Sequence, residues 1–187
     1  MEEIKSKKGF TVIEVALVLA IAGVIFLMVF IALPALQRSQ RDAKRRDDVG
    51  VLLAALQRFQ TNNRGALPTG DTGTAGVKWN SEVEGMPDGD TSWKGFYKSF
   101  LGKTFEDPAG FFYTLKAGDC GANTGSECSF GRVANDGTSL EASNYTMFIV
   151  KSAACDGSKA VGSGNPRRVA VLYKMEGSGG AYCANSQ

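Results

Sequence analysis

One long run of uncharged residues lies close to the N-terminus of this chain. After Glu14, the 22 residues from 15 to 36 carry no charged side chain. A helix of that length extends roughly 30 Å, which is the thickness of the hydrocarbon core of a bilayer. The run is apolar on all sides, unlike a surface helix with a single apolar stripe. The pattern therefore predicts a helix that lies in lipid or among other apolar helices.

A secretory signal peptide is the main alternative for this run. Signal peptides have a shorter apolar region, which ends at a cleavage site with small residues. Here the run passes through Pro34 and Leu36 directly into a further helical pattern. A stable anchor therefore fits the sequence better.

The charges that flank the run leave its orientation ambiguous. Three lysines precede it, and five basic residues follow it closely: Arg38, Arg41, Lys44, Arg45 and Arg46. A simple count of positive charges places the C-terminal side in the cytoplasm. The cysteines of the C-terminal half indicate the opposite, and we give them more weight.

The helical pattern continues over Gln37–Asn62 but becomes one-sided. Apolar residues recur at spacings of three and four at Val49, Leu52, Leu56 and Phe59. We assign the charged residues to the opposite face: Arg38, Arg41, Arg45, Asp48 and Arg58. The first half of the helix is therefore expected to project, and the second half to pack on the rest of the chain.

Several residues predict where this helix bends and where it ends. Pro34 removes a backbone hydrogen bond and Gly23 lowers helix propensity, so both favour local bending or melting. The segment Asn62-Asn63-Arg64-Gly65 predicts the end, because Gly65 readily adopts the left-handed conformation and Pro68 follows. The result is one helix of about 50 residues, too long for a small globular domain.

The rest of the chain holds most of the 23 glycines and predicts a loop-rich head. The segment Gly70–Gly89 has loop composition, and the aromatic spacing in Trp93–Phe105 predicts a short helix. Strands are expected at 111–116, 144–151 and 167–175, with a closing segment at Tyr182 and Cys183. We therefore expect an α+β, lollipop-like fold, in which the long helix packs on a small antiparallel sheet. Its predicted parts are a leader (1–9), an apolar helix (10–36), an amphipathic half-helix (37–65) and a head (66–187).

The four cysteines indicate disulfides and an oxidising compartment. They are separated by 7, 26 and 27 residues and form no C-x-x-C pair, which argues against zinc. Three pairings are open, and we favour Cys120–Cys128 with Cys155–Cys183 because these pairs close the shortest loops. Four free thiols in a cytosolic protein are the alternative.

The charge and the composition argue against several functional classes. The formal net charge is +2 with interleaved signs, unlike a dedicated nucleic-acid binder. The absence of histidine removes the commonest general base and metal ligand. Asp136 and Glu141 offer oxygen ligands for calcium, but their spacing is not that of an EF-hand loop. We expect no enzyme activity, no cofactor and no metal site.

The segment Lys7-Lys8-Gly9-Phe10-Thr11-Val12-Ile13-Glu14 resembles the processing site of type IV prepilins and pseudopilins. This resemblance implies that a membrane-embedded prepilin peptidase cuts between Gly9 and Phe10 and methylates the new N-terminal Phe10. The resemblance extends from this segment through the helix as far as Pro68, whereas the head is similar to the family only in its general character.

The resemblance also implies a structural function. The chain would be a single-pass precursor in the bacterial cell membrane and then a subunit of an extracellular pilus. Its partners would be copies of itself and the inner-membrane assembly machinery, with cytoplasmic motor ATPases that extend and retract the filament. Adhesion, twitching motility or DNA uptake would follow, with a host-cell surface or DNA as further partners.

Glu14 is the candidate assembly residue, together with Phe10. A carboxylate at the start of a membrane helix is costly unless it is paired. The new amino group of Phe10 in a neighbouring subunit would offset that cost when the subunits are in register. The local alternative is that Glu14 stabilises the N-terminus of its own helix.

Two other functions remain open. The turn Asp107-Pro108-Ala109-Gly110 resembles one that is common in pseudopilins of type II secretion, so a pseudopilin of a secretion or competence system is the first alternative. The second is a membrane-anchored binding protein that stays monomeric and keeps its uncut N-terminus.

Overall fold

The computed structural model describes residues 9–69, 77–78, 89–101, 106–120, 124–128, 145–177 and 180–186. The basic leader residues, most of the loop predicted over Gly70–Gly89, and the calcium candidates Asp136 and Glu141 lie outside these residues. The chain divides into two units, Met1–Ser39 and Gln40–Gln187. Its class is α+β, with a long N-terminal helix followed by a small disulfide-bonded sheet domain. That class confirms the sequence prediction.

Helix α1 runs without interruption over Val12–Asn62. It is the one helix within the described residues that is long and apolar enough to cross a membrane, and no residue of its most apolar stretch is buried. Gly23 and Pro34 both lie inside it, so this conformation contains no break at either residue. Local melting at these positions during assembly stays a prediction.

The C-terminal end of α1 matches the stop signal in the sequence. Arg64 and Gly65 both have positive φ angles, 54° and 86°, and the Gly65 N–H donates to the carbonyl of Gln60 at 2.7 Å. A Cβ atom at Gly65 would also lie 2.7 Å from Nε of Arg167. Glycine at this position therefore supplies both the left-handed turn and space for a neighbouring side chain.

The main sheet has five strands in the order β1-β2-β3-β6-β7. Their bounds are Val77–Lys78, Thr114–Asp119, Thr146–Lys151, Val169–Lys174 and Ala181–Asn185. Strands β2 and β3 are parallel and the other neighbours are antiparallel, so the sheet is mixed and not antiparallel throughout as predicted. The chain between β2 and β3 is longer than the dozen or so residues that a parallel connection needs, so its length permits this pairing.

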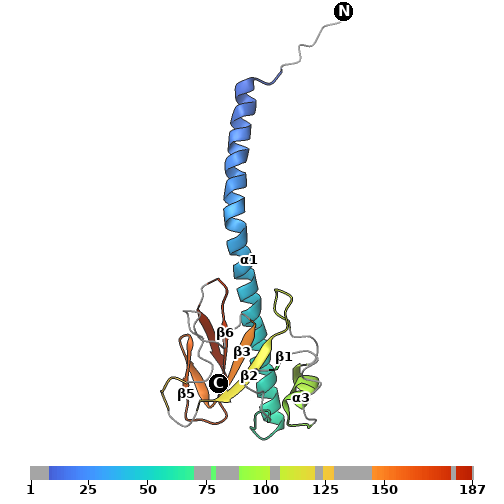
Figure 1. The fold of residues 1–187 in the computed structure, drawn as a ribbon, viewed down its shortest axis with the longest axis vertical. Coiled ribbons are helices and arrows are strands. Elements are labelled where there is room, and N and C mark those ends of the chain that lie inside the picture. The colour runs from blue at the N-terminus through green and yellow to red at the C-terminus, as the bar shows by residue number, and fades with distance from the viewer. Residues whose placement is uncertain are drawn as a thin grey trace, which may run out of the picture. The chain divides into compact units, whose positions relative to one another are not determined.

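Alternate residues of the strands divide between two cores, as the two-residue period of a strand requires. The first core lies between the sheet and the second half of α1 (Figure 1), and on the sheet side it contains Tyr113, Leu115, Met147, Ile149, Val169, Val171 and Tyr173. Leu52, Leu56 and Phe59 of α1 are buried there, with exposures of 0–1%. The apolar stripe predicted over this half of the helix is therefore its packing face.

A short helical segment completes the first core. Helix α3, Trp93–Phe96, begins at Ser92, whose hydroxyl accepts the N–H of Gly95 at 3.1 Å, and continues as a π-helical turn over Tyr97–Leu101. The rings of Phe96 and Phe100 lie 5.7 and 5.3 Å from the ring of Phe59, both edge-on. The helix predicted from the aromatic spacing is thus present over the described residues 93–101.

The second core lies on the opposite face of the sheet. The hairpin of β4 (Ala153–Asp156) and β5 (Lys159–Gly162) covers Phe148, Val150 and Leu172, together with both disulfides. No sequence pattern predicts this hairpin, because its strands of four residues carry mainly alanine, glycine and single charges instead of a β-branched run.

Candidate processing and assembly site

Gly9 and Phe10 precede the first helical residue, Val12, and both are exposed. The side chain of Phe10 is 90% exposed. The peptide bond between them therefore lies in accessible, non-helical backbone, where a protease can reach it. The structure thus places the predicted processing residues just outside the end of a long helix.

Glu14 and Thr11 form a reciprocal cap at the start of α1. The carboxylate atom Oε2 of Glu14 accepts the backbone N–H of Thr11 at 2.8 Å and the Thr11 hydroxyl at 2.7 Å. The Thr11 hydroxyl oxygen in turn accepts the N–H of Glu14 at 3.4 Å. This is a capping box, with threonine at the cap and glutamate three residues later. The local role that the sequence left open for Glu14 is therefore present in the single chain.

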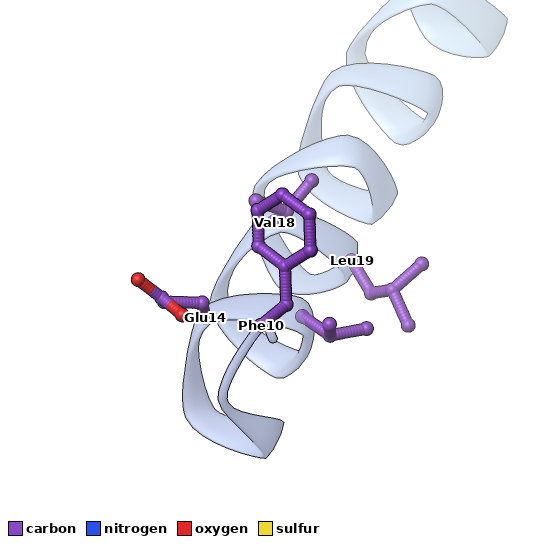
Figure 2. A pocket seen from close by; sticks show the side chains of 5 residues that line it. Phe10, Glu14, Val18 and Leu19 are labelled. Atoms are coloured by element: carbon purple, nitrogen blue, oxygen red, sulfur yellow. The ribbon is translucent and has the colours of Figure 1, made fainter. Parts of the chain in front are cut away.

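Phe10 and Glu14 border a shallow depression on the side of α1. Figure 2 shows the Phe10 ring lying along the helix beside Val18, while the Glu14 carboxylate is directed away from the ring. Val15 and Leu19 complete the lining. The depression therefore combines an apolar floor with one carboxylate at its edge.

A second cluster of charged residues is buried at the start of the head-packed half of α1. The guanidinium of Arg45 is bidentate on Asp107, with Nε–Oδ2 and Nη2–Oδ1 distances of 2.5 and 2.9 Å. Its Nη1 also donates to Asp42 at 3.2 Å and to Glu176 at 3.1 Å. The side chains of Arg45 and Asp107 are 2% and 0% exposed. The three carboxylates neutralise the charge of Arg45, and the cluster links three separate segments of the chain.

Asp42 and Asp107 also bind the backbone of the segments that they join. The Asp42 carboxylate accepts the N–H groups of Glu176 and Gly177, at 2.9 and 2.8 Å, in the turn between β6 and β7. Asp107 accepts the N–H of Ala109 at 2.8 Å, and its carbonyl accepts that of Gly110. The carboxylates therefore shape two turns and hold both against α1.

The electrostatics of this cluster follow from burial and from its hydrogen bonds. Burial alone lowers the pKa of Arg45, but the hydrogen bond to Asp107 raises it, and the net pKa lies above the ordinary value. Burial raises the pKa of Tyr113, and Asp48 raises it further by accepting the tyrosine hydroxyl at 2.9 Å. The hydrogen bond from Arg41 holds the pKa of Glu176 below its ordinary value. The arginine therefore stays charged and the tyrosine neutral at neutral pH.

Arg45 and Asp48 lie on the packing face of α1, so their predicted position on the opposite face is wrong. They were expected on the face opposite the apolar stripe, but they are 2% and 5% exposed on the packing face. The signal was available, because Arg45 lies four residues before Val49 and so extends the same stripe by one turn. The prediction failed because it required buried positions to be apolar.

The two disulfides are Cys120–Cys128 and Cys155–Cys183, the pairs favoured from the sequence. The first joins the end of β2 to the segment beside β5, and the second joins β4 to β7. Both therefore attach the hairpin layer to the main sheet. Within the described residues, no group of three or more histidine, cysteine, aspartate or glutamate side chains is arranged to hold a metal ion.

Comparisons of this chain with protein-family models, with curated proteins and with solved structures found no match.

We expect Arg45→Leu to destabilise the head by about 3–5 kcal/mol, because it leaves two buried carboxylates without their countercharge. Arg41→Gln is the matched control, since it breaks only the partly exposed pair with Glu176 and is expected to cost much less. Urea unfolding of the full chain in neutral detergent, followed by near-UV circular dichroism, measures both. Equal losses in the two variants would contradict the assigned role of Arg45.

The pKa of Glu176 predicts a specific acid sensitivity. Because this pKa is lower in the folded chain, the carboxylate stabilises the fold above its unfolded pKa of about 4.3. That contribution is lost as the pH falls through the lower folded pKa. Glu176→Gln should therefore show a smaller drop in melting temperature between neutral and acidic pH than the wild type.

Glu106→Gln is the control for this titration, because it neutralises an exposed carboxylate outside the cluster. It should keep the wild-type acid sensitivity. An unchanged acid sensitivity in Glu176→Gln would exclude Glu176 as a contributor to it.

Proposed function

We propose that this chain is a pilin-like structural subunit, cut after Gly9 and polymerised through its apolar helix into an extracellular filament. The observation that carries the proposal is the contrast between the two parts of α1. Large apolar side chains of residues 10–36 are exposed, from 46% at Val29 to 90% at Phe10. The head, in contrast, buries its own core and carries two disulfides.

The exposed segment supplies a driving force for assembly. Apolar side chains outside lipid avoid water only by burying against other apolar surface. A bundle of these helices from many copies would bury them, with the heads on the outside. Before assembly the same segment would hold the precursor in the membrane, where the prepilin peptidase and the inner-membrane assembly machinery act.

Glu14 has the chemistry to set the register of such a bundle. In the described part of the chain, its Oε2 atom accepts both bonds from Thr11, and Oε1 accepts none. Oε1 therefore remains available for the amino group that cleavage creates on Phe10 of a neighbouring subunit. A buried pair of this kind forms only when the subunits are aligned, which favours correct docking.

A pseudopilin of a secretion or competence system is the second candidate. The resemblance of the turn Asp107-Pro108-Ala109-Gly110 to one in pseudopilins favours it, and this turn is held rigidly by Arg45. A pseudopilin would be processed in the same way but would stay in a short structure within the cell envelope.

Intact mass spectrometry without reductant, on filaments sheared from the native cells, tests the proposal. A chain that begins at methylated Phe10 and holds two disulfides is the expected result. Processed chain that is confined to membranes would favour the pseudopilin. A chain that still begins at Met1 would support a monomeric anchored protein and would contradict both filament proposals. In Gly9→Ala the uncut precursor should accumulate in the membrane.

The role of Glu14 can be separated from its local capping. Glu14→Ala removes both the cap and the charge, whereas Glu14→Gln keeps a capping box and removes only the charge. We expect both variants to be processed normally and both to lose filaments, measured as chain recovered in the sheared fraction. Normal filament yield from Glu14→Gln would show that capping suffices and that no charge pair is needed.

A further inference from the structure

Helix α1 holds the turn between β6 and β7 through two side chains that lie one helical turn apart, Asp42 and Arg46. The Asp42 carboxylate accepts the N–H groups of Glu176 and Gly177, at 2.9 and 2.8 Å. Arg46 follows four residues later, on a neighbouring part of the same helix face. Its Nη2 atom donates to the sulfur of Met175 at 3.4 Å. Side chains of α1 therefore bind successive residues of this turn.

The sulfur of Met175 is a weak acceptor for a guanidinium group. Thioether sulfur accepts hydrogen bonds poorly, whereas arginine forms its strong bonds with carboxylates and phosphates. Arg46 forms no ion pair with any residue that the structure describes. Its guanidinium lies 5.6 Å from the centre of the Tyr182 ring. Arg46 therefore keeps donor capacity that a better acceptor at this place would use.

Met175 is the methionine of the described head that solvent can reach. The residue is partly exposed, and its contact with Arg46 lies at the surface. Met147 in β3, the other methionine of the described head, is 0% exposed. Because exposure of the sulfur favours oxidation, Met175 is expected to react before Met147 in the folded head.

We propose that Met175 is an oxidation site of the head, at which Arg46 binds the oxygen of the resulting methionine sulfoxide. The oxidant is a hydroperoxide, such as hydrogen peroxide. A lone pair of the sulfur attacks one peroxide oxygen, so that the S–O bond forms as the O–O bond breaks. The proton of the transferred oxygen passes to the departing hydroxide, which leaves as water. The sulfur is oxidised and the peroxide is reduced, and a weak acceptor becomes a polar oxygen.

The position of Arg46 determines how this oxidation affects the fold. A sulfoxide usually disrupts its surroundings, because it introduces a polar group among apolar ones. Here a charged donor already lies beside the sulfur, and bonds from charged donors are stronger than those between neutral groups. The backbone at Met175 is also fixed, since its N–H donates to the carbonyl of Gly180 at 2.8 Å. The added oxygen therefore strengthens the attachment of this turn to α1.

The test treats the full chain in a neutral detergent with hydrogen peroxide. Mass spectrometry of digested chain measures oxidation at each methionine, and near-UV circular dichroism gives the melting temperature before and after treatment. Arg46→Ala removes the proposed donor. Arg168→Ala is the matched control, because it removes the same charge from an exposed residue outside this turn. Met175→Leu, alone and combined with Arg46→Ala, shows what oxidation of the other methionines contributes.

We expect Met175 to be oxidised while Met147 in the folded head stays intact. Oxidation should change the melting temperature of the wild type and of Arg168→Ala by the same amount. Relative to these two, oxidation should lower the melting temperature of Arg46→Ala by about 2 °C or more, because the new oxygen then lacks its donor. With Met175→Leu in the background, treatment should affect chains with and without Arg46→Ala equally.

Three results would overturn the proposal. One is oxidation of Met175 that is no faster than that of Met147. Another is an equal change in the wild type and in Arg46→Ala, since the guanidinium would then not bind the sulfoxide oxygen. The third is a loss in Arg168→Ala as large as that in Arg46→Ala, which would reflect net charge alone. The inference does not rest on filament formation, because both side chains belong to one head and the assay uses unassembled chain.

Discussion

Arg45 binds three carboxylates that come from three segments of the chain, and the arrangement of the head depends on this contact. Asp42 lies one turn away on α1, Asp107 lies in the turn before β2, and Glu176 lies in the turn between β6 and β7. Removing an arginine from water is costly, and only complete pairing offsets that cost. An apolar stripe alone would tolerate small rotations and shifts of the helix. We infer that the ionic cluster fixes one rotation and one position of the helix on the sheet, because any other arrangement leaves a buried charge unpaired.

The two halves of α1 differ in what covers their apolar side chains. In the second half, the stripe that includes Leu52, Leu56 and Phe59 is buried against the sheet of its own chain. The apolar side chains of residues 10–36 have no such partner among the described residues. The head needs no external surface, because its two cores and two disulfides stabilise it on both faces of the sheet. The exposed half is long and apolar enough to serve as a membrane anchor.

Most of the fold was predictable from the spacing of apolar residues and from the residues that end helices and strands. The helix, its end at Asn62, the strands at 146–151 and 169–174, and the packing stripe all rest on local patterns, whereas the strand predicted at 111–116 lies at 114–119. The parallel pairing of β2 and β3 was not predictable, because no local pattern in either strand specifies the direction of its neighbour. The hairpin β4–β5 was not predictable from the sequence, because its packing beside the disulfides stabilises it more than β propensity does. The buried Arg45 escaped because its partners are remote in sequence, at residues 107 and 176.

The ion pairs also bear on the conflict over orientation. The count of basic residues after the apolar run opposes export of the head, whereas the disulfides require an oxidising compartment. Three of those five residues, Arg41, Lys44 and Arg45, have carboxylate partners in the folded head. If the head is exported, their charge opposes transfer only while the head is unfolded, and folding neutralises it. Formation of the head around Arg45 would in this way hold the chain in the orientation that the disulfides need.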